Sequence, residues 1–180
     1  MTNDDVTERL DFARRRLDDI RALIAAKTLG TELHLRQQLA QEFFFHVVGA
    51  IDVLARLVNE RRSLDLDSED VSITAVAKKL PPDDPLASAL LGLHVKPRGQ
   101  PLPPDSYSPD GYLFRLYNYR HQVTHRRRNP FHFQLGSTSP SFPLDPRDPK
   151  GAHSKNTSED DMQRMLDLVA SRCAGAVGLV

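Results

Sequence analysis

The sequence predicts an all-α protein, a bundle of four to six helices joined by long proline-rich loops. Two long N-terminal stretches carry apolar residues at spacings of three and four, which is the period of an amphipathic α-helix. Two further helices are predicted, from residue 109 to about residue 128 and from residue 158 onward. Most of the prolines fall between these stretches, as expected because proline breaks a helix interior.

Length and composition favour a single domain over residues 1–180, with an extended connector at 94–108 and a long loop at 129–157. The 24 basic and 24 acidic residues balance, so no global charge indicates a nucleic-acid partner, and local clusters carry more information. The single cysteine, Cys173, excludes an intrachain disulfide framework and a cysteine-rich metal site, and we interpret it as a packing thiol.

The N-terminus and the hydropathy pattern predict a cytoplasmic protein. Acidic residues at Asp4, Asp5 and Glu8 are unlike a signal peptide. No stretch approaches the roughly 20 apolar residues needed to cross a bilayer, so no membrane association is expected.

The first long helix is expected to begin at Thr2 or Asn3, which can cap it, and to stop at Gly30. The run from Arg14 to Arg16 is interpreted as a solvated face rather than an RNA contact. The apolar stripe predicted to pack comprises Val6, Leu10, Ala13, Leu17, Ile20 and Ile24.

The second helix is predicted over residues 31–61 and is apolar most of the way round at its middle, which is typical of a central bundle helix. His46 is interpreted as a hydrogen-bonded core or boundary histidine rather than a ligand, and Glu42 or Asp52 could orient an imidazole if either faces the motif described below. The expected packing positions are Leu35, Leu39, Phe43, Phe44, Phe45, Val47, Val48, Ala50, Ile51, Leu54, Leu57 and Val58.

Shorter elements fill the rest of the chain. Two short helices are predicted at 71–80 and 85–93, separated by two prolines and two aspartates. Residues 131–135 alternate apolar and polar, which favours a short strand or an extended strip, and 136–156 should be a long loop. Ser158 is expected to cap the last helix.

The motif Arg120-His121-x-x-x-His125 closes the helix that Ser108-Pro109 should start. Each helical residue turns about 100°, so His121 and His125 share one face, with Arg120 at its shoulder. We call the stripe formed by these three residues, extended by Asn118 and Arg128, the polar ridge.

This motif resembles the signature of HEPN domains, in which an arginine, a polar residue, three arbitrary residues and a histidine occur late in an all-helical domain. The resemblance covers the motif and a similar order of helices over most of the chain. It implies a dimer whose paired motifs form a metal-independent ribonuclease site in a cleft between subunits, often in a toxin or a phage-defence protein, with an antitoxin or another defence protein as partner.

The residue types suit that chemistry. Histidine exchanges protons near neutral pH, and arginine offers a planar fork that matches phosphate oxygens. We therefore assign His125 as general acid or base, Arg120 as phosphate clamp and His121 as a helper. The RNA backbone is expected to contact Asn118, Arg126, Arg127 and Arg128.

Other site types fit less well. There is no glycine-rich phosphate loop and no serine or cysteine nucleophile motif. A zinc site at His121 and His125 lacks an evident third ligand, so neither a metal nor a cofactor is expected. The alternative function is a non-catalytic helical module that binds a protein partner or a nucleotide, with the polar ridge buried in an interface.

Overall fold

A computed structural model describes residues 2–26, 33–94, 105, 107–125 and 157–180, and within residues 33, 34, 37 and 121–125 it describes the backbone. The described residues form helices and no strand, which confirms the predicted all-α class. The helices are α1 (Asn3–Ala25), α2 (Leu33–Arg61), α3 (Ile73–Lys79), α4 (Pro85–Leu91), α5 (Pro109–His125) and α6 (Glu159–Val177).

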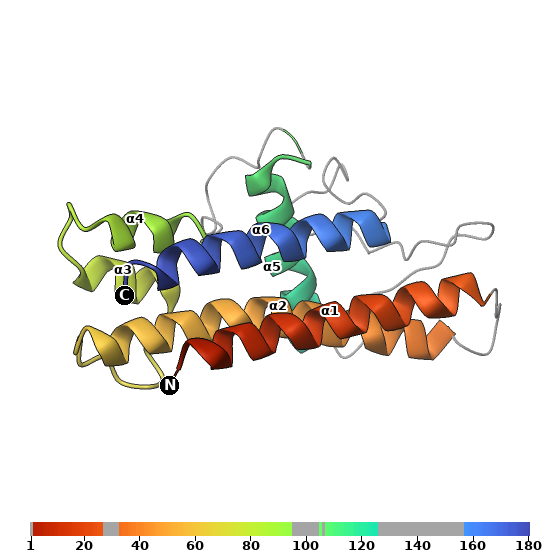
Figure 1. The fold of residues 1–180 in the computed structure, drawn as a ribbon, viewed down its shortest axis with the longest axis horizontal. Coiled ribbons are helices and arrows are strands. Elements are labelled where there is room, and N and C mark those ends of the chain that lie inside the picture. Colours follow the sequence, from red (N-terminus) through yellow and green to blue (C-terminus); the bar gives the residue numbers. More distant parts are fainter. Residues whose placement is uncertain (1, 27–32, 95–104, 106, 126–156) are drawn as a thin grey trace.

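The helices lie in two layers (Figure 1). Helices α1 and α2 run side by side in opposite directions, and α6 lies along the same long axis in the second layer. The short helices α3 and α4 pack together at the end of the bundle where the C-terminus lies. Helix α5 crosses the long axis steeply and packs on both α2 and α6, so its two sides meet different neighbours.

Local capping chemistry sets the helix starts. The Thr2 amide donates to the Asp5 carboxylate at 2.8 Å, and Ser158 and Asp161 cap each other reciprocally at α6. The Ser108 hydroxyl accepts from the Gly111 amide at 3.0 Å and so starts α5. These starts confirm the capping residues that the sequence predicts for α1, α5 and α6.

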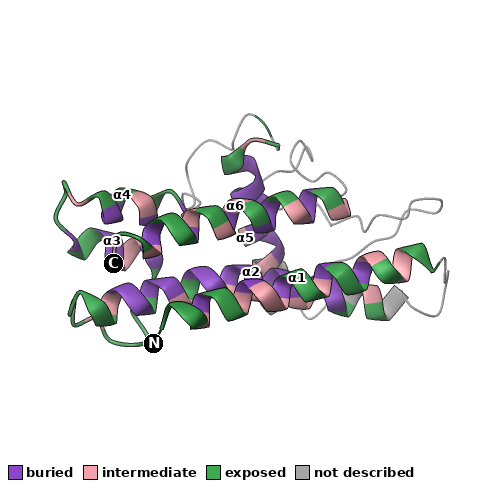
Figure 2. Ribbon diagram, in the orientation of Figure 1, coloured by how far each residue is buried: buried purple, intermediate pink, exposed green. Residues whose placement is uncertain are grey.

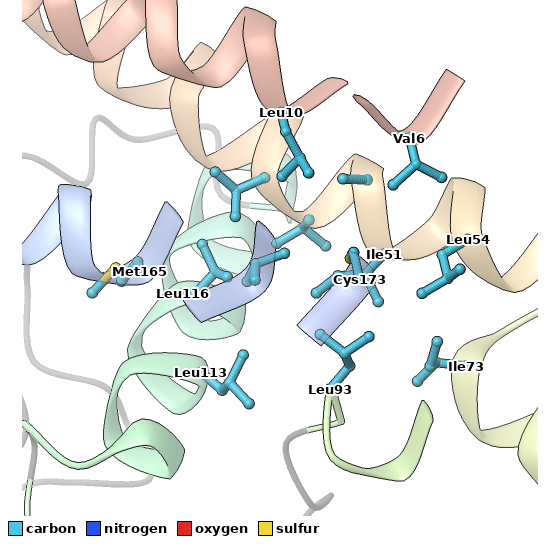
Figure 3. Packing of buried hydrophobic residues seen from close by; sticks show 14 of the residues in the cluster. Val6, Leu10, Ile51, Leu54, Ile73, Leu93, Leu113, Leu116, Met165 and Cys173 are labelled. Atoms are coloured by element: carbon cyan, nitrogen blue, oxygen red, sulfur yellow. The ribbon is translucent and has the colours of Figure 1, made fainter. Parts of the chain in front are cut away.

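One cluster of buried apolar side chains draws on all six helices. Phe43, Phe44 and Leu54 in the middle of α2 are completely buried, as the prediction of a central helix requires. Figure 3 shows how Leu113 and Leu116 of α5 join this cluster beside Met165 and Cys173 of α6. Figure 2 shows the buried positions between the layers and the exposed ones along the outside of α1.

Two predicted packing positions of α2 are wrong. Leu35 is 44% exposed and Phe45 is 47% exposed. The apolar pattern of α2 is wide enough to suggest burial all round, but packing against α1, α5 and α6 still leaves part of its circumference open to water. Ile24, expected in the stripe of α1, is half-buried.

The short helices are briefer than predicted. Helix α3 begins only after Ser72, whose hydroxyl accepts from the Ala75 amide, and it ends before Pro81. Helix α4 stops at Leu91, where Gly92 caps it, rather than at residue 93. Both helices are shorter than predicted at their ends, and the apolar residues Ile73, Leu80 and Leu93 near those ends stay buried.

Several expectations lie outside the described residues: the stop at Gly30, most of the connector at 94–108, the strip at 131–135, the loop at 136–156 and the motif-helix residues after His125. Among the helices that the structure describes, none combines the length and the apolarity needed to cross a membrane.

Candidate functional site on helix α5

The predicted motif lies on a continuous helix. The backbone of α5 is helical from Pro109 to His125, so Arg120, His121 and His125 follow one another over about one and a half turns. The backbone therefore places the two histidines, four residues apart, on the same side of α5. Their side chains, and residues Arg126, Arg127 and Arg128, lie outside the described part of the chain.

Arg120 lies against a carboxylate from the neighbouring helix. Its Nη2 is 3.7 Å from Oδ2 of Asp52 on α2, and the two side chains are 38% and 53% exposed. Partial removal of water raises the pKa of Asp52, while the Arg120 charge acts in the opposite direction. Asp52 thus faces the guanidinium of the polar ridge, a contact that the sequence left open, whereas Glu42 pairs with Arg16 of α1 at 3.4 Å.

The N-terminal end of the polar ridge is closed to solvent in this chain. Asn118 is only 7% exposed, so the surface of the chain does not present it to a ligand. The neighbouring Tyr117 hydroxyl donates to the backbone oxygen of Leu93 at 3.4 Å, and burial raises the pKa of Tyr117. The described part of the ridge therefore divides into a buried amide and a half-exposed guanidinium.

The sequence interpretation missed a second arginine of α5. Arg115 is 1% exposed, and its Nη2 donates to Oγ1 of Thr157 at 2.8 Å and to Oδ2 of Asp161 at 3.3 Å. The Tyr119 hydroxyl lies 2.7 Å from the same Thr157 oxygen. Within the described residues, Nε and Nη1 of Arg115 have no hydrogen-bond partner, so much of this buried charge depends on Asp161 for compensation.

Aromatic rings complete the surroundings of Arg115. The Tyr112 hydroxyl donates to Oδ1 of Asp161 at 3.2 Å, and the Arg115 guanidinium carbon lies 5.7 Å from the centres of the Tyr107 and Tyr112 rings. We call the set formed by Arg115 with Tyr112, Tyr119, Thr157 and Asp161 the buried arginine network. In the sequence, this network is indicated by one feature, which is the charged residue Arg115 between the apolar residues Leu113 and Leu116.

The sequence raises the question of two further kinds of site, a reactive cysteine and a metal site. Cys173 is buried, which raises the pKa of its thiol to about 12 and fits the packing role expected from the sequence. Among the described residues there is no group of three or more His, Cys, Asp or Glu side chains that could hold a metal ion.

The accessible part of α5 and its neighbour α2 therefore provides a guanidinium with a nearby carboxylate, next to the helical positions of two histidines. No protein-family model, no curated protein and no solved structure matches this chain.

Proposed function

We propose that this protein is a metal-independent endoribonuclease of the HEPN type, which acts as a homodimer in a toxin–antitoxin or phage-defence setting. The observation that carries the proposal is the continuous helix through Arg120, His121 and His125, with the Arg120 guanidinium half-exposed beside Asp52. A rigid helix keeps acid–base and phosphate-binding groups in fixed register, as catalysis requires.

The chemistry follows from the side chains. Metal-free cleavage requires that the 2′-hydroxyl loses a proton, that charge on the phosphate is stabilised and that the leaving 5′-oxygen gains a proton. We assign the proton transfers to His125 with help from His121, because an imidazole titrates near working pH. Arg120 stabilises the charge that grows on the phosphate oxygens.

Asp52 acts in this proposal as the resting partner of Arg120. The 3.7 Å separation is longer than a charge-assisted hydrogen bond of about 2.7–2.9 Å, and half-exposed ion pairs of this kind contribute little stability. An RNA phosphate that accepts a bidentate contact from Arg120 can therefore replace the carboxylate at low cost.

Dimerisation would double the set of groups. One copy of Arg120 and His125 supplies one clamp and one acid or base, and a two-fold axis would place a second set across a shared cleft. In this arrangement Arg126, Arg127 and Arg128 hold the RNA backbone through contacts that weaken with salt. An antitoxin or other defence protein would act by covering this cleft.

Cleavage of RNA in EDTA by the purified protein tests the proposal. We expect wild type to degrade RNA and to have the mass of a dimer in solution, and we expect Arg120→Ala and His125→Ala to lose cleavage. Arg21→Ala is the matched control, because among the described residues Arg21 forms its ion pair with its helix neighbour Asp18 on α1. Cleavage that survives both α5 substitutions would contradict the assignment.

Burial of Asn118 favours a second candidate, a non-catalytic helical module that binds a protein partner or a nucleotide. In that case the polar ridge forms a hydrogen-bonded network inside an interface rather than an open site. The same variants distinguish the two: the module predicts no cleavage by wild type, together with loss of the dimer or of partner binding in Arg120→Ala.

A further inference from the structure

The arginines of α1 fall into two groups. Three of them pair with carboxylates on their own helix: Arg14 with Asp11 at 2.6 Å, Arg16 with Asp19 at 3.0 Å and Arg21 with Asp18 at 3.6 Å. The other two, Arg9 and Arg15, form no ion pair with any carboxylate of the described residues and lie over aromatic rings instead. The tripeptide Arg14–Arg16, uniform in sequence, is therefore not uniform in structure.

The rings under these arginines come from α1 and α2 and contact one another through His46. Phe12 stacks on His46 with a centroid separation of 5.1 Å and an interplanar angle of 18°, and Phe45 meets His46 edge-on at 5.5 Å. The guanidinium carbon of Arg15 lies 4.5 Å from the centre of the Phe12 ring, and that of Arg9 lies 5.7 Å from the centre of the Phe45 ring. We call these five residues the arginine–aromatic patch.

The patch is partly open to solvent. Phe45 is 47% exposed and Arg15 is exposed, while Phe12, His46 and Arg9 are half-buried. Nη1 of Arg9 lies 3.4 Å from Nδ1 of His46, and the positive charge nearby adds to burial in lowering the pKa of His46. The imidazole ring thus stacks on Phe12 and meets Phe45 edge-on, so the three rings are in contact.

We propose that the arginine–aromatic patch binds single-stranded RNA, with bases stacking on its rings and guanidinium planes and phosphates contacting Arg9 and Arg15. Aromatic platforms flanked by arginines are how proteins hold unpaired strands, because every base has a stacking face. A duplex conceals those faces, so the patch selects single strands. This inference deepens the proposed function by naming its substrate class, and it rests on that function for the choice of RNA.

The charge pattern favours a nucleic acid over a protein partner. An acidic peptide would require free cations but gains nothing specific from three rings in contact, whereas a strand of bases uses both. Two nearby carboxylates are paired with other arginines, Asp11 with Arg14 and Glu42 with Arg16, whereas Arg9 and Arg15 pair with no carboxylate of the described residues.

The test measures binding separately from cleavage. A short fluorescein-labelled single strand of 2′-O-methyl RNA, which offers no 2′-hydroxyl for cleavage, is titrated with the full chain and followed by fluorescence anisotropy. Arg15→Gln and Phe45→Leu are each expected to weaken binding roughly tenfold, the effect typical of losing one stacking contact. Arg15→Lys keeps the charge but loses the plane, and it should weaken binding by about threefold.

Arg14→Gln is the matched control. It removes the same charge from the adjacent position, but Arg14 pairs with Asp11 and lies over no ring among the described contacts, so we expect less than a twofold change. A single DNA strand of the same sequence should bind comparably, because the patch reads bases and phosphates rather than the sugar. Arg15→Gln and Phe45→Leu should leave the circular dichroism spectrum unchanged, since neither residue is in the buried core.

Three results would overturn the inference. The first is absence of single-strand binding by wild type. The second is equal weakening of RNA binding by Arg14→Gln and Arg15→Gln, which would mean that the strand is attracted by positive charge alone and not by stacking. The third is a changed mass in solution for Phe45→Leu with unchanged RNA binding, which would make the patch a protein interface. If cleavage depends on Arg120 while the patch variants bind RNA normally, the proposed function stands and this inference fails. If binding depends on the patch but no RNA is cleaved, this inference stands and the proposed function fails.

Discussion

Helix α5 carries two arginines five positions apart, and each meets an aspartate from another helix. The side chains of Arg115 and Asp161 are 1% and 9% exposed, whereas those of Arg120 and Asp52 are 38% and 53% exposed. The first pair shares its surroundings with Thr157 and buried tyrosines, and the second is open to water. The same residue types are therefore enclosed by the fold in one place and reach solvent in the other.

The extent of burial determines how much each of these two ion pairs matters for stability. Removing one member of a buried pair leaves the other charged without water or a partner, which costs far more than the pair itself contributes. A half-exposed pair is screened by solvent, so either member can be lost or replaced by a ligand. The following predictions test this contrast from its largest expected effect to its smallest.

Arg115→Ala is expected to lower the free energy of unfolding by about 3–5 kcal/mol, because it leaves Asp161 charged and buried. Urea denaturation followed by circular dichroism measures the change. Arg120→Ala serves as the control on the same helix and should change the unfolding free energy by about 1 kcal/mol or less. Equal losses in the two variants would remove the contrast.

Arg120→Ala is expected to reduce RNA cleavage by about a hundredfold to a thousandfold, as loss of a group that stabilises transition-state charge does. The measurement is the initial cleavage rate in EDTA at saturating RNA. Arg120→Lys keeps the charge without the planar fork and should recover only part of the rate. A rate that falls only in proportion to a loss of folded protein would indicate a structural role instead.

Asp52→Asn is expected to tighten RNA binding by about threefold, because the amide no longer competes with phosphate for Arg120. Anisotropy titration with uncleavable RNA measures it. Asp83→Asn removes the same charge from an exposed position in the turn before α4 and should have a smaller effect. Equal tightening by both substitutions would mean that only the net charge matters.

The smallest effect concerns pH. Burial raises the pKa of Asp52 above its ordinary value of 3.8, so the folded protein holds this proton more tightly than the unfolded chain does. Its contribution to stability is complete below pH 3.8 and is lost as the pH rises through the raised pKa. The urea midpoint of Asp52→Asn should lack this decline. A pH dependence identical to that of wild type would show that Asp52 is not its source.

The sequence was sufficient for features that depend on local spacing. The stripe from Val6 to Ile20 is buried as predicted, and Ser158 caps α6 as predicted, because both follow from residues within one or two turns. The motif helix was also predicted from its start at Ser108-Pro109. The roles of its histidines stay predictions.

Contacts between distant segments could not be predicted in this way. The sequence pattern predicts that Phe45 is buried, but once α1 packs against α2 the side chain of Phe45 remains exposed. Arg115 finds its partners more than forty positions along the chain, at Thr157 and Asp161, and no local pattern encodes that distance. The pairing of Asp52 with Arg120 likewise depends on the angle at which α5 crosses α2.

The buried arginine network has a consequence for the chain between α5 and α6. Arg115 precedes the segment 126–156, and Thr157 and Asp161 directly follow it, so their contacts join the two flanks of that segment independently of its length. The entropy of closing a loop grows slowly with the number of residues. The Arg115 contacts therefore set the separation of the two flanks, which is the distance that the intervening chain has to span.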